Sequence, residues 1–235
     1  VWGAWIYEYA HTSDHGIICL MVKHMLEGKA FPVFFYGLPY MGAIEPAVSA
    51  ALCALFGLTG FWINMGTALV AFAFLPLVYL WGRGAAGRTA GLAALAFCVI
   101  GPPHYFQFES WADGGYAAIP FFSVLVLLLT VRLLAREAAG KRAGHGAFLA
   151  LGLAAGLGWW QSPLLLAAFA VSAILFLAVL RARVFTVRLA SGAAGFLLGS
   201  LPLWLWNLRN QWQTFDMVRT HDRPPLLEGL RLFYG

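Results

Sequence analysis

Long apolar runs separated by short basic segments constrain the fold of this chain more than any other feature. The candidates for membrane spans are Phe61 to Trp81, Gly91 to Pro103, Ala117 to Leu134, Ala147 to Trp160, Pro163 to Leu180 and Leu189 to Trp206. A helix needs roughly 20 apolar residues to cross a hydrocarbon core of about 30 Å, so the second and fourth candidates are short. With 61% hydrophobic and 11% charged residues, the chain lacks the polar surface of a soluble domain. We predict an all-α, polytopic transmembrane helix bundle with about six spans.

The positions of the basic residues predict an orientation. Three segments between the spans contain nine of the 15 Lys and Arg residues and one acid, Glu137. These residues are Arg83, Arg88, Arg132, Arg136, Lys141, Arg142, Arg181, Arg183 and Arg188. Because Lys and Arg accumulate in cytoplasmic loops, we expect these segments inside, and we do not expect a nucleic-acid partner. Residues 1–60 would then be external, 61–206 would form the membrane bundle, and 207–235 would be a second external segment.

The first external region is expected to contain short interfacial helices. The apolar run Ile17 to Leu26 follows Ser13 and Asp14, either of which would cap it, and ends at Gly28. The apolar run Pro46 to Phe56 is too short to span a membrane and should lie along the outer interface. Because the chain opens without a signal segment, we also expect a membrane helix before its first residue.

Three acids in the expected external loops are candidates for chemistry. Asp14 has two readings, a helix cap or a catalytic base, and a cap is also a rigid mount for a carboxylate. Glu109 and Asp113 flank Trp111 beside an apparent membrane boundary. Acids in that position are either solvated by the loop or part of a site.

Other polar side chains of the first external region also have two readings. Glu45 precedes a proline and is expected to cap a helix. Tyr36 and Tyr40 belong to an aromatic patch that suits either a membrane interface or a sugar. His15 lies four residues after His11, but no helical pattern surrounds His11, which disfavours a metal site. The motifs of soluble hydrolases and nucleotidases are absent from the sequence.

Several short motifs then follow in a fixed order. After the acid that begins the first helix come "HMLEGKAFPVFFYGLPYMGAIEP", the basic turn "YLWGRGAAGR" and a loop with "ADGGY". Further along stand "GLAAGLGWWQSP" and "LPLWLWNLRNQWQTF". In this order the motifs resemble the GT-C membrane glycosyltransferases over nearly the whole chain. The resemblance is to the bacterial family 39-like branch, which is related to protein O-mannosyltransferases and the lipid A aminoarabinose transferase.

The resemblance implies a fold, a reaction and a site. It implies transfer of a sugar from a polyprenyl phosphate or diphosphate to a hydroxyl or amine of a protein, lipid or glycan, at the external face of a bacterial inner membrane. The catalytic acid of the family matches Asp14, and Glu109 or Asp113 occupies the region of a second acid. Two departures stand out: the family commonly has Asp-Glu where this chain has Asp14-His15, and a phosphate-binding Lys of the aminoarabinose enzymes is missing near Glu45.

Sugar transfer makes physical demands of its own. A base must take the acceptor proton, and Asp14 is the candidate. Cations must stabilise the leaving phosphate, and we expect Arg209, with Lys29 and Arg219 behind it, to do so. The expected substrate-binding residues are His15, Lys29, Tyr36, Tyr40, Glu45 and Arg209. One base candidate and no convincing nucleophile favour single displacement with inversion. No cofactor is expected, and a divalent cation is left open.

Two other classes of function compete with an enzyme. A transporter or lipid flippase usually has ionisable groups in mid-span, whereas the spans predicted here contain none. A non-catalytic scaffold subunit of a membrane complex is the second alternative. Donor cleavage, vectorial movement of solute or lipid, or neither would separate the three.

Overall fold

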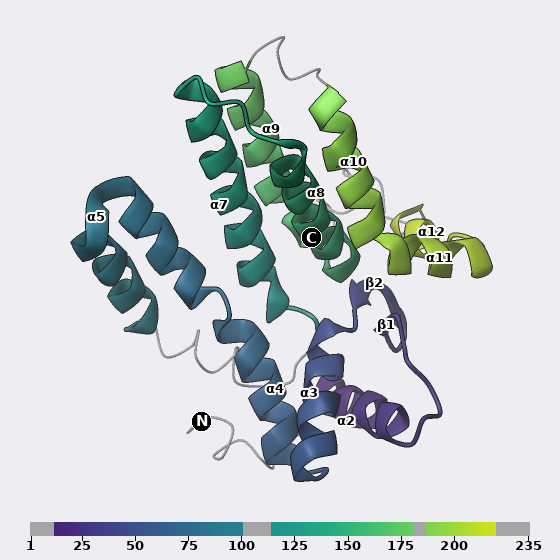
Figure 1. Ribbon diagram of the computed structural model, residues 1–235. Helices are drawn as coiled ribbons and strands as arrows, with labels where there is room; N and C mark the ends of the chain where they lie inside the picture. Colours follow the sequence, from purple (N-terminus) through teal and green to yellow (C-terminus); the bar gives the residue numbers. More distant parts are fainter. Residues whose placement is uncertain (1–11, 101–113, 181–186, 220–235) are drawn as a thin grey trace, which may run out of the picture.

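The computed structural model describes residues 12–100, 114–180 and 187–219, which are mostly helical (Figure 1). The helices are α2 Ser13–Leu26, α3 Ile44–Phe56, α4 Gly60–Phe72, α5 Leu75–Val99, α7 Ala118–Ala138, α8 His145–Gln161, α9 Leu166–Leu180, α10 Val187–Gly199, α11 Leu201–Arg209 and α12 Gln213–Arg219, with a 3₁₀ turn at Pro163–Leu165. Both helices expected in the first external region are present, and each begins earlier than the apolar run that predicted it.

A short antiparallel hairpin corrects the all-α prediction. Strand β1 is Phe34–Phe35 and strand β2 is Leu38–Gly42, with an irregular register between them. Aromatic residues favour strands, and Gly37 adopts a φ of 83° in the turn, where a side chain would be strained. The hairpin lies between two helices that the apolar pattern predicted, in a stretch where that pattern carries no signal.

The membrane character of the helices is supported by length and composition. In the part of the chain that the structure describes, three helical runs are long and apolar enough to cross a membrane: Gly60–Val99, Ala118–Ala138 and Pro163–Leu180. A fourth is added if Arg188–Gly199 and Leu201–Arg209, which are bent by 57° at their junction, count as one span. The count of about six spans stays a prediction.

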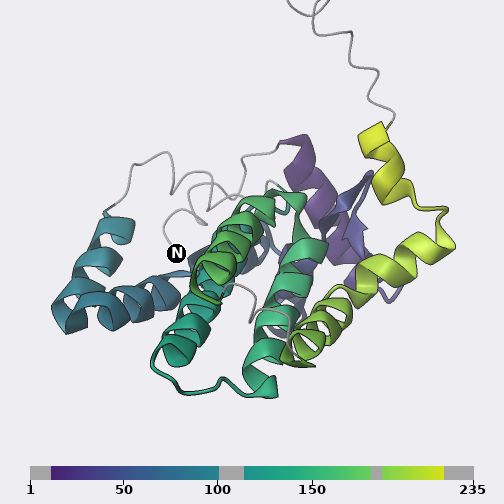
Figure 2. The same ribbon diagram turned by 90° about the horizontal axis from the view of Figure 1, so that it is seen from above.

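The first of these runs reverses direction inside α5. Ala86 and Gly87 have non-helical backbone angles, and Gly87 has a φ of 86°. The helical segments on either side then touch, because a methyl group on Gly91 would lie 2.8 Å from the carbonyl oxygen of Tyr79. The reversal falls within the basic motif "YLWGRGAAGR". In two views, α5 lies on the opposite side of the molecule from α11 and α12 (Figures 1 and 2).

Helices α8 and α10 pack with their backbones in contact. A methyl group on Gly199 would lie 2.5 Å from the carbonyl oxygen of Leu153, which no real side chain tolerates. Methyl groups on Gly152, Gly156 and Gly195 would meet main-chain atoms of the facing helix just as closely. Glycines four residues apart on both helices create this approach. Small residues at this spacing are typical of helices that pack closely in membranes.

The molecule has two distinct ends. The reversal in α5, the α7–α8 connection and the start of α10 lie at one end, and α2, α3 and the hairpin lie at the other (Figure 1). We call the first the basic end, because its segments contain Arg83, Arg88, Arg136, Lys141, Arg142 and Arg188. We call the other the hairpin end. Gathering Lys and Arg at one end is what the positive-inside rule leads one to expect of a membrane bundle.

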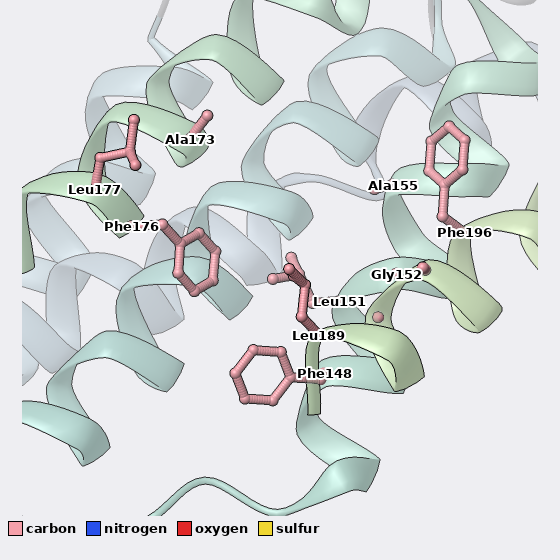
Figure 3. Close-up of a pocket in the computed structure, with 11 residues that line it drawn as sticks. Phe148, Leu151, Gly152, Ala155, Ala173, Phe176, Leu177, Leu189 and Phe196 are labelled. Atoms are coloured by element: carbon pink, nitrogen blue, oxygen red, sulfur yellow. The ribbon is translucent and has the colours of Figure 1, made fainter. Parts of the chain in front are cut away.

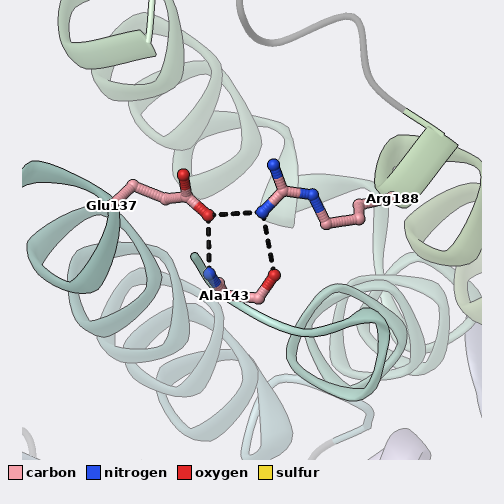
Figure 4. A network of polar contacts seen from close by, with 3 residues as sticks. All are labelled: Glu137, Ala143 and Arg188. Carbon is pink, nitrogen blue, oxygen red and sulfur yellow. Dashed lines mark hydrogen bonds and ion pairs between the residues drawn. The ribbon is translucent and has the colours of Figure 1, made fainter. Parts of the chain in front are cut away.

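The single acid of the basic end is held in an ion pair. Arg188 Nη1 lies 2.7 Å from Glu137 Oε1 and also donates to the carbonyl oxygen of Ala143 at 2.9 Å (Figure 4). The Ala143 amide donates to the same carboxylate at 2.7 Å. Since both charged side chains are largely buried, the network joins α7, the α7–α8 connection and α10. This network therefore explains why one acid, Glu137, occurs among the basic residues of this end.

The glycine packing predicts a selective effect on stability. Gly156→Leu would force α8 away from α10, and we expect a loss of about 1–3 kcal/mol or more. Gly146, near the start of the same helix, is exposed, and a methyl group added to it would have no other atom within 4 Å. Gly146→Leu should therefore leave stability unchanged or slightly raised. Thermal unfolding of the detergent-solubilised protein measures both, and equal unfolding temperatures for the two variants would contradict the packing.

Candidate functional site

The helix that carries Asp14 is capped by a different residue. Its N-cap is Thr12, whose Oγ1 accepts a hydrogen bond from the amide of His15 at 3.1 Å. The expectation that Ser13 or Asp14 would cap this helix is wrong, because the helix begins four residues before the apolar run does. Asp14 lies in the first turn and is half-buried. The helix dipole stabilises a carboxylate at that position.

The Asp14 carboxylate shares a corner of the structure with two other segments. A methyl group on Gly114 would lie 3.8 Å from Asp14 Oδ2 and 3.7 Å from Phe35 Cε2. Gly114 itself has a φ of 84°, a conformation that strongly favours glycine. We call Asp14, Phe35 and Gly114 the Asp14 corner. Here α2, β1 and the end of the second expected external loop meet.

Two of the predicted catalytic acids cannot be placed. Glu109 and Asp113 lie outside the described residues. Gly114, which follows Asp113 in the sequence, is the first described residue of that loop. The loop that contains Glu109 and Asp113 therefore approaches Asp14 at Gly114, within the residues that the structure describes.

A buried glutamine at the end of α8 holds this loop against the hairpin. Gln161 is fully buried, and its Nε2 donates to the carbonyl oxygen of Gly115 at 3.1 Å. A methyl group on Gly42 would lie 2.7 Å from Gln161 Oε1, so strand β2 passes directly over the amide. The preceding residue, Trp160, donates from Nε1 to the carbonyl oxygen of Val33 at 3.0 Å. The end of α8 thus anchors both non-helical segments.

The segment that begins at residue 207, also expected to be external, packs on the hairpin as well. Thr214 Oγ1 donates to the carbonyl oxygen of Pro39 at 2.6 Å, and Asn207 Nδ2 donates to Thr214 Oγ1 at 2.9 Å. The rings of Trp206 and Phe34 meet edge to face with centroids 5.0 Å apart. The described parts of all three segments are therefore in contact at the hairpin end.

The remaining predicted side chains on α2 and the hairpin are mostly packed inward. His15 is 3% exposed. The hydroxyl of Tyr36 lies 2.9 Å from His24 Nδ1, which joins the hairpin to α2. Tyr40 is half-buried against the cluster of apolar residues between α2 and α3. Of these three, Tyr36 alone contributes to the wall of a pocket described below.

Glu45 lies inside the protein between α3 and α4. It is fully buried, and Thr67 Oγ1 donates to its Oε1 at 2.8 Å. The N-cap residue of α3 is Ala43, with no side-chain hydrogen bond to the helix end, so the expected capping role is not observed. Buried polar groups need such partners, and the bond to Thr67 ties the two helices together. Glu45 is separate from the Asp14 corner.

Two of the predicted cations, Lys29 and Arg209, differ in how they are engaged. Lys29 Nζ lies 2.6 Å from Glu27 Oε2, and this hydrogen bond lowers the pKa of the Glu27 carboxyl below its usual value. Arg209 is exposed at the end of α11, one helical turn beyond Trp206. Residues three apart on a helix are surface neighbours, so Arg209 lies close to the wall that Trp206 forms beside the hairpin. Arg209 is the better placed of the two to meet a ligand there.

Neither a metal cluster nor the main apolar groove belongs to this corner. Within residues 12–100, 114–180 and 187–219, no group of three His, Cys, Asp or Glu could hold a metal ion. A groove of about 440 Å³ runs between α9 and α10 over α8, lined by residues such as Phe148, Phe176 and Phe196 (Figure 3). It follows α10 from Leu189, near the basic end, to Phe196. A lipid chain suits its apolar wall, but the Asp14 corner is at the hairpin end.

Sequence reasoning missed the residues that position the site. The sequence did not predict Thr12 as the helix cap, because the apolar run indicates a helix that begins later in the chain. Gln161 offered a signal, since a lone amide at the end of an apolar helix usually has a specific partner. Trp206 lies at the end of a predicted span, where a tryptophan is typical of a membrane interface, and its packing against Phe34 leaves no local signal.

Comparison with known proteins brings no match. No family model, no curated protein and no solved structure matches the chain. The case for a function therefore rests on the residues and geometry described above.

The Gln161 anchor predicts a local loss of order. Gln161→Leu would leave the buried carbonyl of Gly115 without its donor, which costs about 1–3 kcal/mol. We expect a lower unfolding temperature and faster hydrogen exchange at Gly42 to Ala43 and Gly115 to Tyr116. Gln213→Leu replaces an exposed glutamine and should change stability by less than about 0.5 kcal/mol. The anchor is refuted if both variants exchange at the wild-type rate in these segments.

Proposed function

We propose that the chain is a membrane glycosyltransferase that moves a sugar from a polyprenyl phosphate or diphosphate to a hydroxyl or amine acceptor. The observation that supports this best is the Asp14 corner, where a half-buried carboxylate at a helix start faces Phe35 and the end of a second loop. A base for transfer needs a fixed carboxylate on a surface that substrate can reach. Asp14 has the fixed mount, and the neighbouring loops supply the surface.

The reaction assigns a role to each group. The acceptor oxygen or nitrogen attacks the anomeric carbon while Asp14 takes its proton, and the bond from that carbon to the phosphate oxygen breaks. The phosphate leaves with the bonding electrons, so attack from the opposite face inverts the anomeric centre. A positioned base contributes about 10²- to 10⁴-fold to such a step.

The leaving phosphate needs a cation that is not already neutralised. Lys29 is paired with Glu27, which leaves Arg209 as the better candidate of the two. A guanidinium can bind two phosphate oxygens at once, which suits a developing negative charge. In the same proposal, Glu109 or Asp113 completes the site beside Asp14.

The membrane arrangement is part of the proposal. The chain would cross a bacterial inner membrane about six times, with the basic end inside and the hairpin end on the external face. The reversal of α5 within a basic motif and the gathering of Lys and Arg segments at one end support this orientation. The donor lipid and the acceptor would then meet the Asp14 corner from outside.

The base assignment predicts a large and specific loss of activity. Asp14→Asn keeps the size of the side chain but removes the base, so we expect transfer to fall by about 10²- to 10⁴-fold. Asp216→Asn, at an exposed acid of α12, should retain wild-type transfer. The measurement is release of radiolabelled sugar from a polyprenyl-phosphate donor in membranes that contain the full-length protein.

This assay, together with a transport assay in vesicles, separates the competing functions. Full activity of Asp14→Asn would rule out Asp14 as the base. Movement of labelled lipid or solute across vesicles without donor cleavage would favour a transporter or flippase. A protein that shows neither cleavage nor transport, with correct folding, would favour a scaffold subunit.

A further inference from the structure

A pocket beside the hairpin has a composition that the proposed chemistry does not use. Its volume is about 360 Å³, and it is lined by residues 30–39 together with Trp206 and Gln213. We call it the hairpin pocket. Sites for small molecules begin at about 300 Å³, so the space is sufficient for one ring-sized ligand.

The walls of the hairpin pocket are aromatic. Phe34 and Phe35 are 4% and 3% exposed, and Trp206 meets Phe34 edge to face. Phe31 is 80% exposed, an unusual state for a phenylalanine next to an ordered hairpin. The exposed Phe31 and the half-buried Trp206 offer apolar ring surface to anything that enters, and the buried Phe34 and Phe35 form the wall behind them.

The polar groups of the pocket are neutral. The described residues that line it include no Asp, Glu, Lys or Arg. Its side-chain hydrogen-bonding groups are the hydroxyl of Tyr36, held by His24, the indole N–H of Trp206 and the exposed amide of Gln213. A phosphate or carboxylate would find no cation among these residues, whereas a ligand with hydroxyl groups would find donors and acceptors.

The pocket is anchored by bonds at two places. Trp160 binds the carbonyl oxygen of Val33, and Thr214 binds that of Pro39, so both arms of the hairpin are tied to helices. A wall that is already ordered loses little conformational entropy when a ligand binds. The hairpin pocket therefore has the rigidity of a built site.

We infer that the hairpin pocket binds a neutral sugar ring. A sugar presents C–H groups on its faces and hydroxyl groups around its edge, which matches aromatic walls with neutral polar groups between them. A lipid chain would match the rings but leave the Tyr36 hydroxyl and the Gln213 amide unused. This inference about sugar binding does not depend on the role given to any other residue of the protein.

The location of the pocket indicates whether it holds the donor sugar or the acceptor sugar, and this step rests on the proposed function. Phe35 lines the pocket, and its ring is also part of the Asp14 corner. A ring in the pocket would share the Phe35 wall with the Asp14 corner, whereas Arg209, the proposed phosphate contact, lies outside the described lining residues, one helical turn beyond Trp206. The hairpin pocket is therefore the subsite for a glycan acceptor.

Binding can be measured without any transfer reaction. The full-length protein is placed in phospholipid nanodiscs prepared without glycolipid or sugar-based detergent. Mannotriose, cellotriose and chitotriose are the probes, and saturation-transfer NMR reports contact of their ring C–H protons with the protein. We expect saturation of at least one probe by the wild-type protein.

Variants locate the bound sugar. Trp206→Ala should weaken binding by several-fold to about tenfold, because one aromatic face is lost, and Trp206→Phe should restore most of it. Gln213→Ala should weaken binding too, and because Gln213 is exposed it keeps the test valid if Trp206→Ala fails to fold. Trp62→Ala removes a tryptophan that stacks on Phe56 outside the pocket and should bind as the wild type does.

The outcomes separate this inference from the proposed function. Asp14→Asn should bind the probe normally even though it fails to transfer sugar. Saturation of no probe, in a folded protein, overturns the inference, and so does binding that neither Trp206→Ala nor Gln213→Ala weakens. A protein that binds sugar at this pocket but shows no transferase activity keeps the pocket and loses the acceptor assignment.

Discussion

The hairpin end depends on side chains that satisfy backbone carbonyls of non-helical segments. A hairpin and a loop packed against apolar helices cannot leave buried polar backbone groups unpaired, because each costs free energy comparable to a lost hydrogen bond. Trp160 and Gln161, adjacent at the end of α8, bind the carbonyl oxygens of Val33 and Gly115, and Thr214 binds that of Pro39. These three bonds fix the surroundings of Asp14.

Glycine serves both the bundle and the site in the same way. In the bundle, glycines let α8 and α10 bring their backbones together, and at the site Gly42 and Gly115 let the chain pass over the amide of Gln161. In each place a single methyl group would overlap atoms that cannot move easily. The position of the loop beside Asp14 is therefore set by close packing as well as by hydrogen bonds.

Charge is separated along the molecule in a way that suits lipid-linked chemistry. At the basic end Glu137 is neutralised by Arg188, so that end is left with an excess of positive charge. At the hairpin end the hairpin pocket shares Phe35 with the Asp14 corner, and the exposed Arg209 follows the pocket residue Trp206 by one helical turn. A base, an acceptor subsite and a phosphate contact would need that division.

The sequence by itself determined the helical, membrane-compatible class, the basic turn in α5 and the glycine contact of α8 with α10, because apolar length, charge position and residue spacing are local patterns. Only the tertiary structure decided the hairpin, the burial of Glu45 against Thr67 and the anchoring role of Gln161. The bonds of Glu45 to Thr67 and of Gln161 to Gly115 join residues far apart in the chain, and the local hairpin is held by the equally distant Trp160 and Thr214. Their partners are chosen by packing and by the need to satisfy buried polar groups, which no local pattern records.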